Sequence, residues 1–305
     1  MVSRMDVFLG VNNCWAVKRF VEPREWVEIT ATRLEVDLVQ FSYDLLDPRS
    51  RREVVKEVVE ETLDAARDYG VKIHSTFTGL AAYSFNLLMH PNPGMRADAL
   101  DWYEQAVRVA GMFKAEATGG HVAAMSWRDH RDPERRKYLL DCLIEALEYL
   151  SGLGKKHGLK MLLWEPMPVA REPPATLEEA KKLIKRVNEG ASIPVKYCID
   201  LGHACNPWTD KKEDLDPYAW LRSLGAESPC IHVQQTDGLM DRHWPFTEEY
   251  NSKGIIKPDK VLEALKESGS SGNYLFLEII HPFEYREDKV LEELEKSVKY
   301  WKDFI

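Results

Sequence analysis

The sequence predicts an α/β protein, a (β/α)8 TIM barrel that forms a single domain over residues 1–305. Short apolar segments alternate with longer, charged amphipathic segments along the whole chain, and the apolar segments number eight. Such alternation is typical of βαβ units with a parallel sheet, and eight units of about 38 residues favour a closed barrel over an open sheet. No linker rich in glycine, serine or proline interrupts the pattern, so we expect one domain.

The expected strands are short and continuously apolar because a parallel sheet is buried on both faces. In chain order they are Val7–Val11, Val36–Phe41, Val71–Ser75, Ala115–His121, Lys160–Trp164, Val195–Ile199, Cys230–Val233 and Tyr274–Ile280. The clearest helices between them are Arg51–Tyr69, Pro133–His157, Leu177–Asn188, Pro258–Lys266 and Asp288–Phe304. In the first of these helices the apolar residues recur at helical spacing on one face, namely Val54, Val55, Val58, Val59, Leu63 and Ala66. The seventh unit carries a long loop, Gln235–Lys257, before its helix.

Composition and charge exclude several classes of protein. A hydrophobic content of 44% over 305 residues excludes intrinsic disorder. A net charge of -9 argues against general binding to nucleic acid, which needs a basic surface. The five cysteines include no closely spaced pair, and no apolar stretch approaches the ~18 residues of a membrane span. We therefore expect a cytoplasmic protein with no nucleic-acid partner and no contact with a membrane.

Four residues with metal-ligand chemistry stand at or near the ends of the last four expected strands. Glu165 follows the fifth strand, Asp200 the sixth, His232 lies within the seventh and Glu278 within the eighth. Catalytic residues of such barrels gather at the carboxyl ends of the strands. Each residue taken alone also has an ordinary structural explanation. A glutamate at a strand end can form a surface ion pair, Asp200 can cap the next segment, and His232 can be a hydrogen-bonded core residue. Their joint placement favours a site for a divalent cation such as Mn²⁺, Mg²⁺ or Co²⁺.

These residues also resemble the signature of a known family. The Glu-Pro pair at Glu165, the Asp-Leu-Gly-His run at Asp200–His203, His232 and Glu278 look like the xylose isomerase-like TIM barrels, over essentially the full chain. The most similar branch is that of the tagatose 3-epimerase-like sugar and sugar-phosphate isomerases and epimerases. The resemblance implies one divalent metal, Mn²⁺ first, bound by Glu165, Asp200, His232 and Glu278. It also implies that the two glutamates move protons and that His203 contacts a substrate oxygen.

The sequence departs from the free-ketohexose epimerases at two positions. Those enzymes usually carry a substrate-binding Glu six residues after the first metal ligand, where this chain has Arg171. They carry an Arg six residues after the metal histidine, where this chain has Gly238. The surrounding motifs look more like the branch that handles short ketoses, such as erythrulose phosphate. The expected substrate is therefore a small sugar or sugar phosphate.

Other residues near the strand ends are candidates for binding the substrate. They are His74, His121, Trp15, Arg171 and Arg242. We expect the two histidines to point toward the rim and the tryptophan to form a wall for the sugar. The two arginines, together with His243 in the loop after the seventh strand, are candidates for binding a phosphate. Ordinary core packing explains the histidines and the tryptophan equally well, and a solvated loop position explains the arginines.

Metal-dependent isomerisation or C3 epimerisation through an enediolate is the expected reaction. Two alternatives stay open at the level of sequence. A sugar or cyclitol dehydratase would use the same metal and intermediate to expel water, as the related inosose and dehydroshikimate dehydratases do. A zinc-dependent abasic-site endonuclease would need a multi-zinc cluster with more histidines, which the net charge of -9 disfavours. A homo-oligomer, either a dimer or a tetramer, is the expected assembly.

Overall fold

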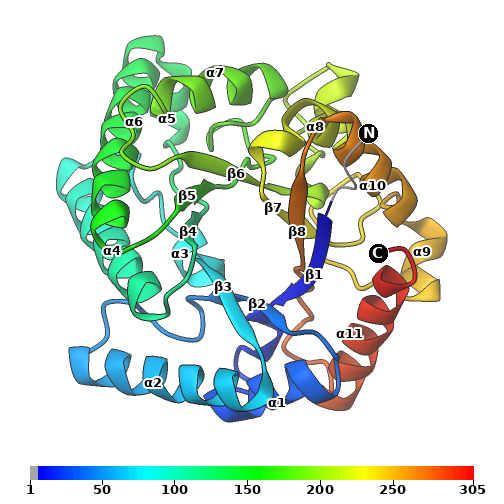
Figure 1. Ribbon diagram of the computed structural model, residues 1–305. Coiled ribbons are helices and arrows are strands. Elements are labelled where there is room, and N and C mark those ends of the chain that lie inside the picture. The colour runs from blue at the N-terminus through cyan, green and yellow to red at the C-terminus, as the bar shows by residue number, and fades with distance from the viewer. Residues whose placement is uncertain (1–5) are drawn as a thin grey trace.

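The computed structural model, which describes residues 6–305, is a closed barrel of eight parallel strands in the order of the chain (Figure 1). Each strand pairs with the next one, and the last strand pairs with the first. The strands are β1 Asp6–Asn12, β2 Leu38–Ser42, β3 Lys72–Phe77, β4 Ala117–Gly120, β5 Met161–Trp164, β6 Val195–Asp200, β7 Cys230–Val233 and β8 Gly272–Leu277. The predicted (β/α)8 architecture is confirmed, and every predicted strand overlaps an observed one.

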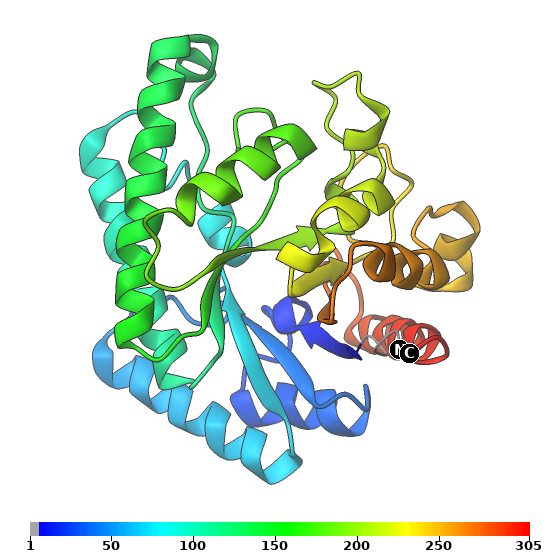
Figure 2. The ribbon, with the colours of Figure 1, turned by 45° about the horizontal axis from the view of Figure 1, so that its top comes forward.

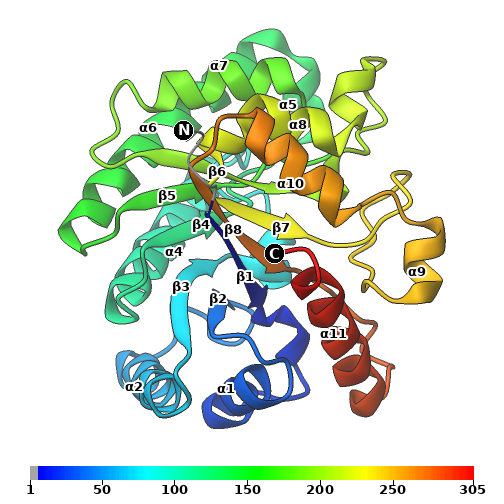
Figure 3. The same cartoon turned by 45° about the vertical axis from the view of Figure 1, so that its right-hand side comes forward.

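Helices form a ring around the barrel, which Figures 2 and 3 show from two tilted directions. They are α1 Pro23–Thr32, α2 Arg52–Tyr69, α3 Gly79–Tyr83, α4 Pro93–Met112, α5 Trp127–Arg131, α6 Pro133–Lys156, α7 Leu177–Val187, α8 Pro217–Leu224, α9 Glu248–Lys253, α10 Pro258–Glu267 and α11 Glu287–Lys302. The short helices α3, α5 and α9 lie in the connections after β3, β4 and β7, where the sequence pattern predicted no helix. None of the helices in the described residues is long and apolar enough to cross a membrane.

Local sequence explains where the outer helices begin and end. Five of them start with proline at the first helical position, where the missing N–H costs nothing, and these are α1, α4, α6, α8 and α10. Asn92 and Asp132 accept hydrogen bonds from free backbone N–H groups at the starts of α4 and α6. Helix α2 ends at Gly70, which adopts the left-handed conformation. The prediction that Val54 lies on the buried face of α2 is wrong, because Val54 is 43% exposed. Val55 and Val59, predicted on the same face, are buried.

Two apolar layers stabilise the barrel. The larger layer lies between the helices and the outside of the sheet. The smaller one fills the barrel interior with side chains from seven different strands, namely Leu38, Phe77, Ala117, Leu163, Cys198, Cys230 and Phe276. This interior is packed rather than open, as is general for the fold. The middle of the barrel therefore has no room for a ligand, and the carboxyl ends of the strands are where this fold places its active sites.

Close packing of β4 against β5 requires glycine at position 119. A Cβ atom added to Gly119 would stand 1.9 Å from the backbone oxygen of Leu163 on β5. We expect Gly119→Ala to lower the free energy of unfolding by about 3 kcal/mol, because backbone cannot yield as a flexible side chain does. Gly152→Ala in the middle of α6 is the matched control, because its Cβ would meet only the hydroxyl of Ser192 at 3.6 Å.

The control should raise the free energy of unfolding by about 0.5–1 kcal/mol through helix propensity. Urea denaturation of the three proteins measures both effects. Equal stabilities of the Gly119→Ala protein and the wild type would show that β4 and β5 are not packed this closely.

Candidate active site

Four predicted ligands come together at the carboxyl end of the barrel. Glu165 directly follows β5, Asp200 ends β6, His232 lies in β7 and Glu278 directly follows β8. One ligand atom from each of them lies within 4.8 Å of the others, and all four residues are buried. The Nδ1 atom of His232 is 2.9 Å from Glu278 Oε2, 3.3 Å from Glu165 Oε1 and 3.7 Å from Asp200 Oδ2. The structure thus brings three carboxylates around one imidazole nitrogen.

Hydrogen bonds behind His232 decide which nitrogen faces this group. Its Nε2 atom lies 2.5 Å from Gln40 Oε1, which also accepts a hydrogen bond from Asn12 Nδ2 at 2.9 Å. The Gln40 amide nitrogen donates to Ser75 Oγ at 3.2 Å, so the carbonyl oxygen of Gln40 faces the imidazole. An oxygen acceptor at this position requires the proton on Nε2. The Nδ1 lone pair of the neutral ring therefore points at the three carboxylates.

This arrangement fits a divalent cation. Among the described residues, neither His232 Nδ1 nor Asp200 Oδ2 has a hydrogen-bond partner, although both atoms are buried. A lone pair and several carboxylate oxygens repel one another in a buried site unless a positive charge lies between them. A metal-bound histidine characteristically donates its outer N–H to an oxygen acceptor, as His232 does to Gln40. The donor set of three carboxylates and one imidazole suits Mn²⁺, Co²⁺ or Mg²⁺.

Without a cation, the electrostatics of the group favour bound protons. Burial raises the pKa of Asp200 to about 6. Burial alone would lower the pKa of His232, but surrounding negative charge, including that of Glu278, leaves it well above its ordinary value. A cation would displace these protons, so its affinity should fall as the pH falls.

A pocket of about 500 Å³ lies over these predicted ligands, and Glu165 and Glu278 are among the residues that line it. Its other polar lining consists of Asp44, Asp241, His121, His203 and His243, with Cys14, Thr78 and Tyr83. Apolar walls come from Phe77, Leu80, Met167 and Ile280. Among the residues that the structure describes, the lining contains four carboxylates and no lysine or arginine. Such a site favours a cation together with a hydroxyl-rich ligand.

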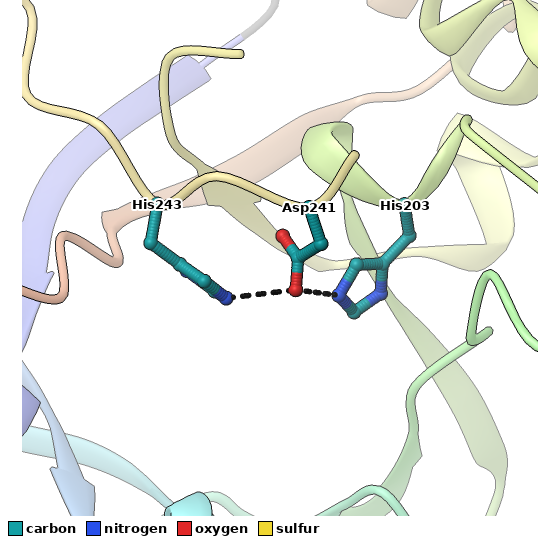
Figure 4. A group of neighbouring side chains, drawn as sticks. All are labelled: His203, Asp241 and His243. Carbon is teal, nitrogen blue, oxygen red and sulfur yellow. Dashed lines mark hydrogen bonds and ion pairs between the residues drawn. The ribbon is translucent and has the colours of Figure 1, made fainter. Parts of the chain in front are cut away.

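In the wall of the pocket, His203, Asp241 and His243 form a second group (Figure 4). His203 ends the short 3-10 helix Leu201–His203, and the other two lie in the loop after β7. Asp241 Oδ2 is 3.4 Å from His203 Nε2 and 3.0 Å from His243 Nε2. The sequence predicted His203 as a substrate residue and His243 as a candidate phosphate ligand, but it gave no role to Asp241. Their convergence depends on the conformation of a loop, which no periodic pattern predicts.

Gln234 connects the two groups. Its Nε2 atom donates to Asp200 Oδ1 at 2.9 Å and to Asp241 Oδ1 at 2.6 Å. Its carbonyl oxygen accepts from the backbone N–H groups of Arg242 and His243. A Cβ atom at Gly202 would lie 2.3 Å from the Gln234 side-chain carbon. The glycine of the Asp-Leu-Gly-His run therefore makes room for the residue that orients both carboxylates.

The predicted substrate residues divide into two sets. His121 and His203 are buried and line the pocket. His74, Trp15, Arg171 and Arg242 do not line it. His74 was expected at the end of β3, but the strand continues three residues further, to Phe77. Its ring instead packs 4.0 Å from that of Tyr274 inside the barrel, where burial lowers its pKa to about 4.

The other three residues have partners elsewhere. Trp15 is buried against Phe20 in the outer apolar layer. Arg171 donates to the backbone oxygen of Met125 at 3.4 Å. Arg242 makes two hydrogen bonds to Asp237 and stacks over Trp244. In this conformation neither guanidinium group reaches the pocket.

Glu172 is not among the site residues predicted from the sequence, which include its neighbour Arg171. Its carboxylate is buried, and Oε2 lies 3.7 Å from His121 Nδ1. Among the described residues, Glu172 Oε2 and both ring nitrogens of His121 lack hydrogen-bond partners. Burial raises the pKa of Glu172 to about 7. His121 lines the pocket and can bind a ligand hydroxyl group there, whereas Glu172 lies behind it, outside the pocket lining.

Comparison with known proteins agrees with this geometry. The family described as "Xylose isomerase-like TIM barrel" matches residues 30–303. A D-erythrulose 1-phosphate 3-epimerase from Brucella abortus (strain 2308) is 31% identical over 311 residues, which cover 97% of this chain and 96% of that protein. The structure of a candidate xylose isomerase from Rhodospirillum rubrum ATCC 11170 superposes with a TM-score of 0.91 at 31% identity, covering 98% of this chain and 99% of the other. The D-psicose 3-epimerase from Clostridium cellulolyticum H10 shares the fold, with a TM-score of 0.70 at 14% identity and coverage of 99% of both chains.

The hydrogen bond from His232 to Gln40 should control the affinity for metal. We expect Gln40→Met to weaken Mn²⁺ binding by about 10- to 100-fold, because the variant loses the acceptor that orients the imidazole. Isothermal titration of the metal-free protein measures this change. Gln235→Met is the matched control, since Gln235 is an equally buried glutamine that bonds Asn251 and Ile256 instead. Unchanged affinity in Gln40→Met would show that Gln40 does not orient a metal ligand.

Glu172 should make the protein less stable at alkaline pH. Its pKa of about 7 in the folded protein lies above the ordinary value of 4.5 for a glutamate. The group therefore favours folding fully below pH 4.5, and that contribution is lost as the pH rises through 7. We expect Glu172→Gln to gain about 3 kcal/mol in the free energy of unfolding, relative to wild type, between pH 4 and pH 8. Urea denaturation at both pH values measures the gain, and the exposed Glu263→Gln should show none. Parallel curves for wild type and Glu172→Gln would contradict the assignment.

Proposed function

The chain belongs to the xylose isomerase-like TIM-barrel family, and we propose that it is a divalent-metal-dependent isomerase or epimerase of a small ketose or its phosphate. The class of sugar isomerases and epimerases follows from the family and from the 31% identical relative. The observation that carries the metal dependence is the His232 Nδ1 atom, which faces three buried carboxylates at the base of a pocket.

Glu165, Asp200, His232 and Glu278 would hold the metal, and Mn²⁺ is our first choice. When bound, a divalent cation supplies the positive charge that polarises a ketose carbonyl and stabilises an enediolate. The protein keeps the ligands oriented through Gln40 and Gln234, so little reorganisation is needed when the substrate binds. The packed barrel interior below excludes water from that side of the site.

Glu165 and Glu278 are the proposed groups that move protons. Both carboxylates belong to the proposed metal ligands and also line the pocket. They come from the ends of β5 and β8, which are three strands apart in the closed barrel. The two groups can therefore approach a substrate carbon from different sides. Epimerisation needs that arrangement, because one proton leaves one face of the carbon and another arrives on the opposite face.

His203 and His121 are the proposed substrate residues among those that line the pocket. The relative from Brucella abortus is named for a phosphorylated four-carbon ketose, and we propose a substrate of that size. Arg171 and Arg242 remain proposed phosphate ligands only if their loops rearrange, since both now bond other groups. Manganese as the native metal, a cytoplasmic location and a homo-oligomeric state stay predictions from the sequence.

The two alternative activities are not favoured. The three relatives described above are named as two 3-epimerases and a candidate xylose isomerase, and none of these three is named as a dehydratase. An abasic-site endonuclease must attract a polyanion, whereas the described lining of this pocket has four carboxylates and no lysine or arginine.

Solvent exchange during turnover tests the two-base proposal. We expect epimerisation of a short ketose phosphate in D₂O to place deuterium at the inverted carbon, as measured by NMR or mass spectrometry. Glu165→Gln and Glu278→Gln should each lower turnover by about 10²- to 10⁴-fold with the metal site kept filled. Glu116→Gln is the control, since Glu116 pairs with Lys72 and Lys160 away from the pocket. Near wild-type turnover in either metal-filled site variant would eliminate that glutamate as a base.

A further inference from the structure

We propose that Asn12 is a positioning residue for the Glu278 carboxylate, which it holds so that Oε2 faces the metal site and Oε1 moves the proton. This inference rests on the function proposed above, in which Glu278 is one of two bases. Asn12 is the last residue of β1 and is buried. It is not among the described residues that line the pocket, so it would act through Glu278 rather than on the substrate.

The closure of the barrel places Asn12 between Gln40 and Glu278. On one side β1 pairs with β2, where Asn12 stands opposite Gln40. On the other side β1 pairs with β8, where Val11 stands opposite Leu277, so Glu278 follows at the level of Asn12. The three side chains therefore meet at the carboxyl rim, although Asn12 and Glu278 are 266 positions apart in the chain.

Hydrogen bonds decide which atom of the Asn12 amide faces these neighbours. Its Oδ1 atom accepts from the backbone N–H of Cys14 at 3.0 Å. Its Nδ2 atom lies 2.9 Å from Gln40 Oε1 and 3.3 Å from Glu278 Oε1. The amide nitrogen has two hydrogens, one for each of these oxygens. The opposite orientation would bring an oxygen against two oxygens and would lose all three bonds.

The two oxygens of Glu278 consequently have different surroundings. Oε2 lies 2.9 Å from His232 Nδ1, the nitrogen that faces the proposed metal site. Oε1 is bonded to Asn12 Nδ2 instead. A carboxylate oxygen has two lone pairs, so Oε1 keeps one of them for a proton of the substrate. The bond to Asn12 also opposes a rotation that would bring both oxygens of Glu278 to the cation.

Gln40 links this arrangement to the metal histidine. Its Oε1 atom accepts from Asn12 Nδ2 and from His232 Nε2. One carbonyl oxygen thus fixes a proposed metal ligand directly and a proposed base through Asn12. Proton transfer is sensitive to such placement, because a displacement of ~1 Å can cost about 10²-fold in rate. A residue that touches no substrate can therefore control turnover.

The two faces of the substrate carbon distinguish the two glutamates. When Glu165 removes the proton of one epimer, the electron pair of the C–H bond passes into the enediolate and the proton stays on Glu165. Glu278 Oε1 then delivers a proton to the opposite face, and the carbon is inverted. If Glu278 is misplaced, the enediolate takes a proton back from Glu165 and the starting epimer is returned. In D₂O this returned epimer carries deuterium once the carboxyl group has exchanged with solvent.

Asn12→Ser removes the donor and keeps the turn, because a serine hydroxyl can still accept the N–H of Cys14 but is too short to reach Glu278. The substrates are D-erythrulose 1-phosphate, after which the Brucella abortus relative is named, and its 3-epimer. With Mn²⁺ saturating, we expect kcat to fall about 10- to 100-fold while KM changes less than about threefold. For one starting epimer, the ratio of deuterium returned to inversion should rise at least about 10-fold, whereas for the other both processes should slow together.

Two further variants and a titration complete the experiment. Asn12→Asp keeps the shape and the turn but replaces the donor with an oxygen, so it should lose at least as much turnover. Asn206→Ser is the matched control, because Asn206 is buried, accepts the N–H of Trp208 at 2.9 Å and donates to the backbone oxygen of Ala175 at 2.8 Å. It should behave as wild type. Isothermal titration with Mn²⁺ should show less than about 10-fold weaker binding in Asn12→Ser, because Asn12 does not bond the oxygen that faces the metal.

The outcomes separate this proposal from the proposed function. Wild-type turnover and an unchanged deuterium ratio in Asn12→Ser would overturn the role of Asn12 and leave the proposed function intact. Lost turnover with an unchanged ratio for both epimers would also overturn it, because Asn12 would then support the fold or the metal rather than Glu278. Absence of both deuterium uptake and inversion in the metal-filled wild type would overturn the proposed function and the role of Asn12 with it.

Discussion

The convergence of negative charge on a buried imidazole nitrogen is the constraint on which the site depends. Three carboxylates face His232 Nδ1, and Gln40 keeps the proton on the opposite nitrogen. Taking charged groups out of water costs several kcal/mol for each one unless a counter-charge compensates. Without a cation, the pKa values of Asp200 and His232 are raised, so both groups hold their protons more tightly than usual. A divalent cation would satisfy the same demand and, in the proposed function, would also polarise the carbonyl group of a ketose.

The barrel provides the conditions for this concentration of charge. Its interior is filled by apolar side chains from seven strands, so the charged groups lie on a dry, rigid base. Gly119 lets β4 approach β5 closely, and Gly202 admits Gln234 between two carboxylates. The pocket above is acidic and contains histidines in place of lysine and arginine in its described lining. Cations rather than basic side chains would therefore supply its positive charge.

The sequence predicted those features that follow from periodicity and from strand ends. Continuous apolar runs located all eight strands, and the four metal-ligand candidates followed because parallel strands deliver their ends to one rim. His74 was misplaced because β3 extends beyond the predicted Ser75 to Phe77. Asp241, His243 and Glu172 lie in loops, whose conformations depend on tertiary hydrogen bonds such as those from Gln234. No local pattern predicts these contacts.

Anomalous diffraction from crystals grown with Mn²⁺ and a short ketose phosphate tests the central claim most directly. The account predicts a strong manganese peak within bonding distance of His232 Nδ1 and of oxygens from Glu165, Asp200 and Glu278. Ketose oxygens should complete the coordination of this ion. A saturated crystal with no peak among these four side chains, or with the ketose bound elsewhere, would contradict the account.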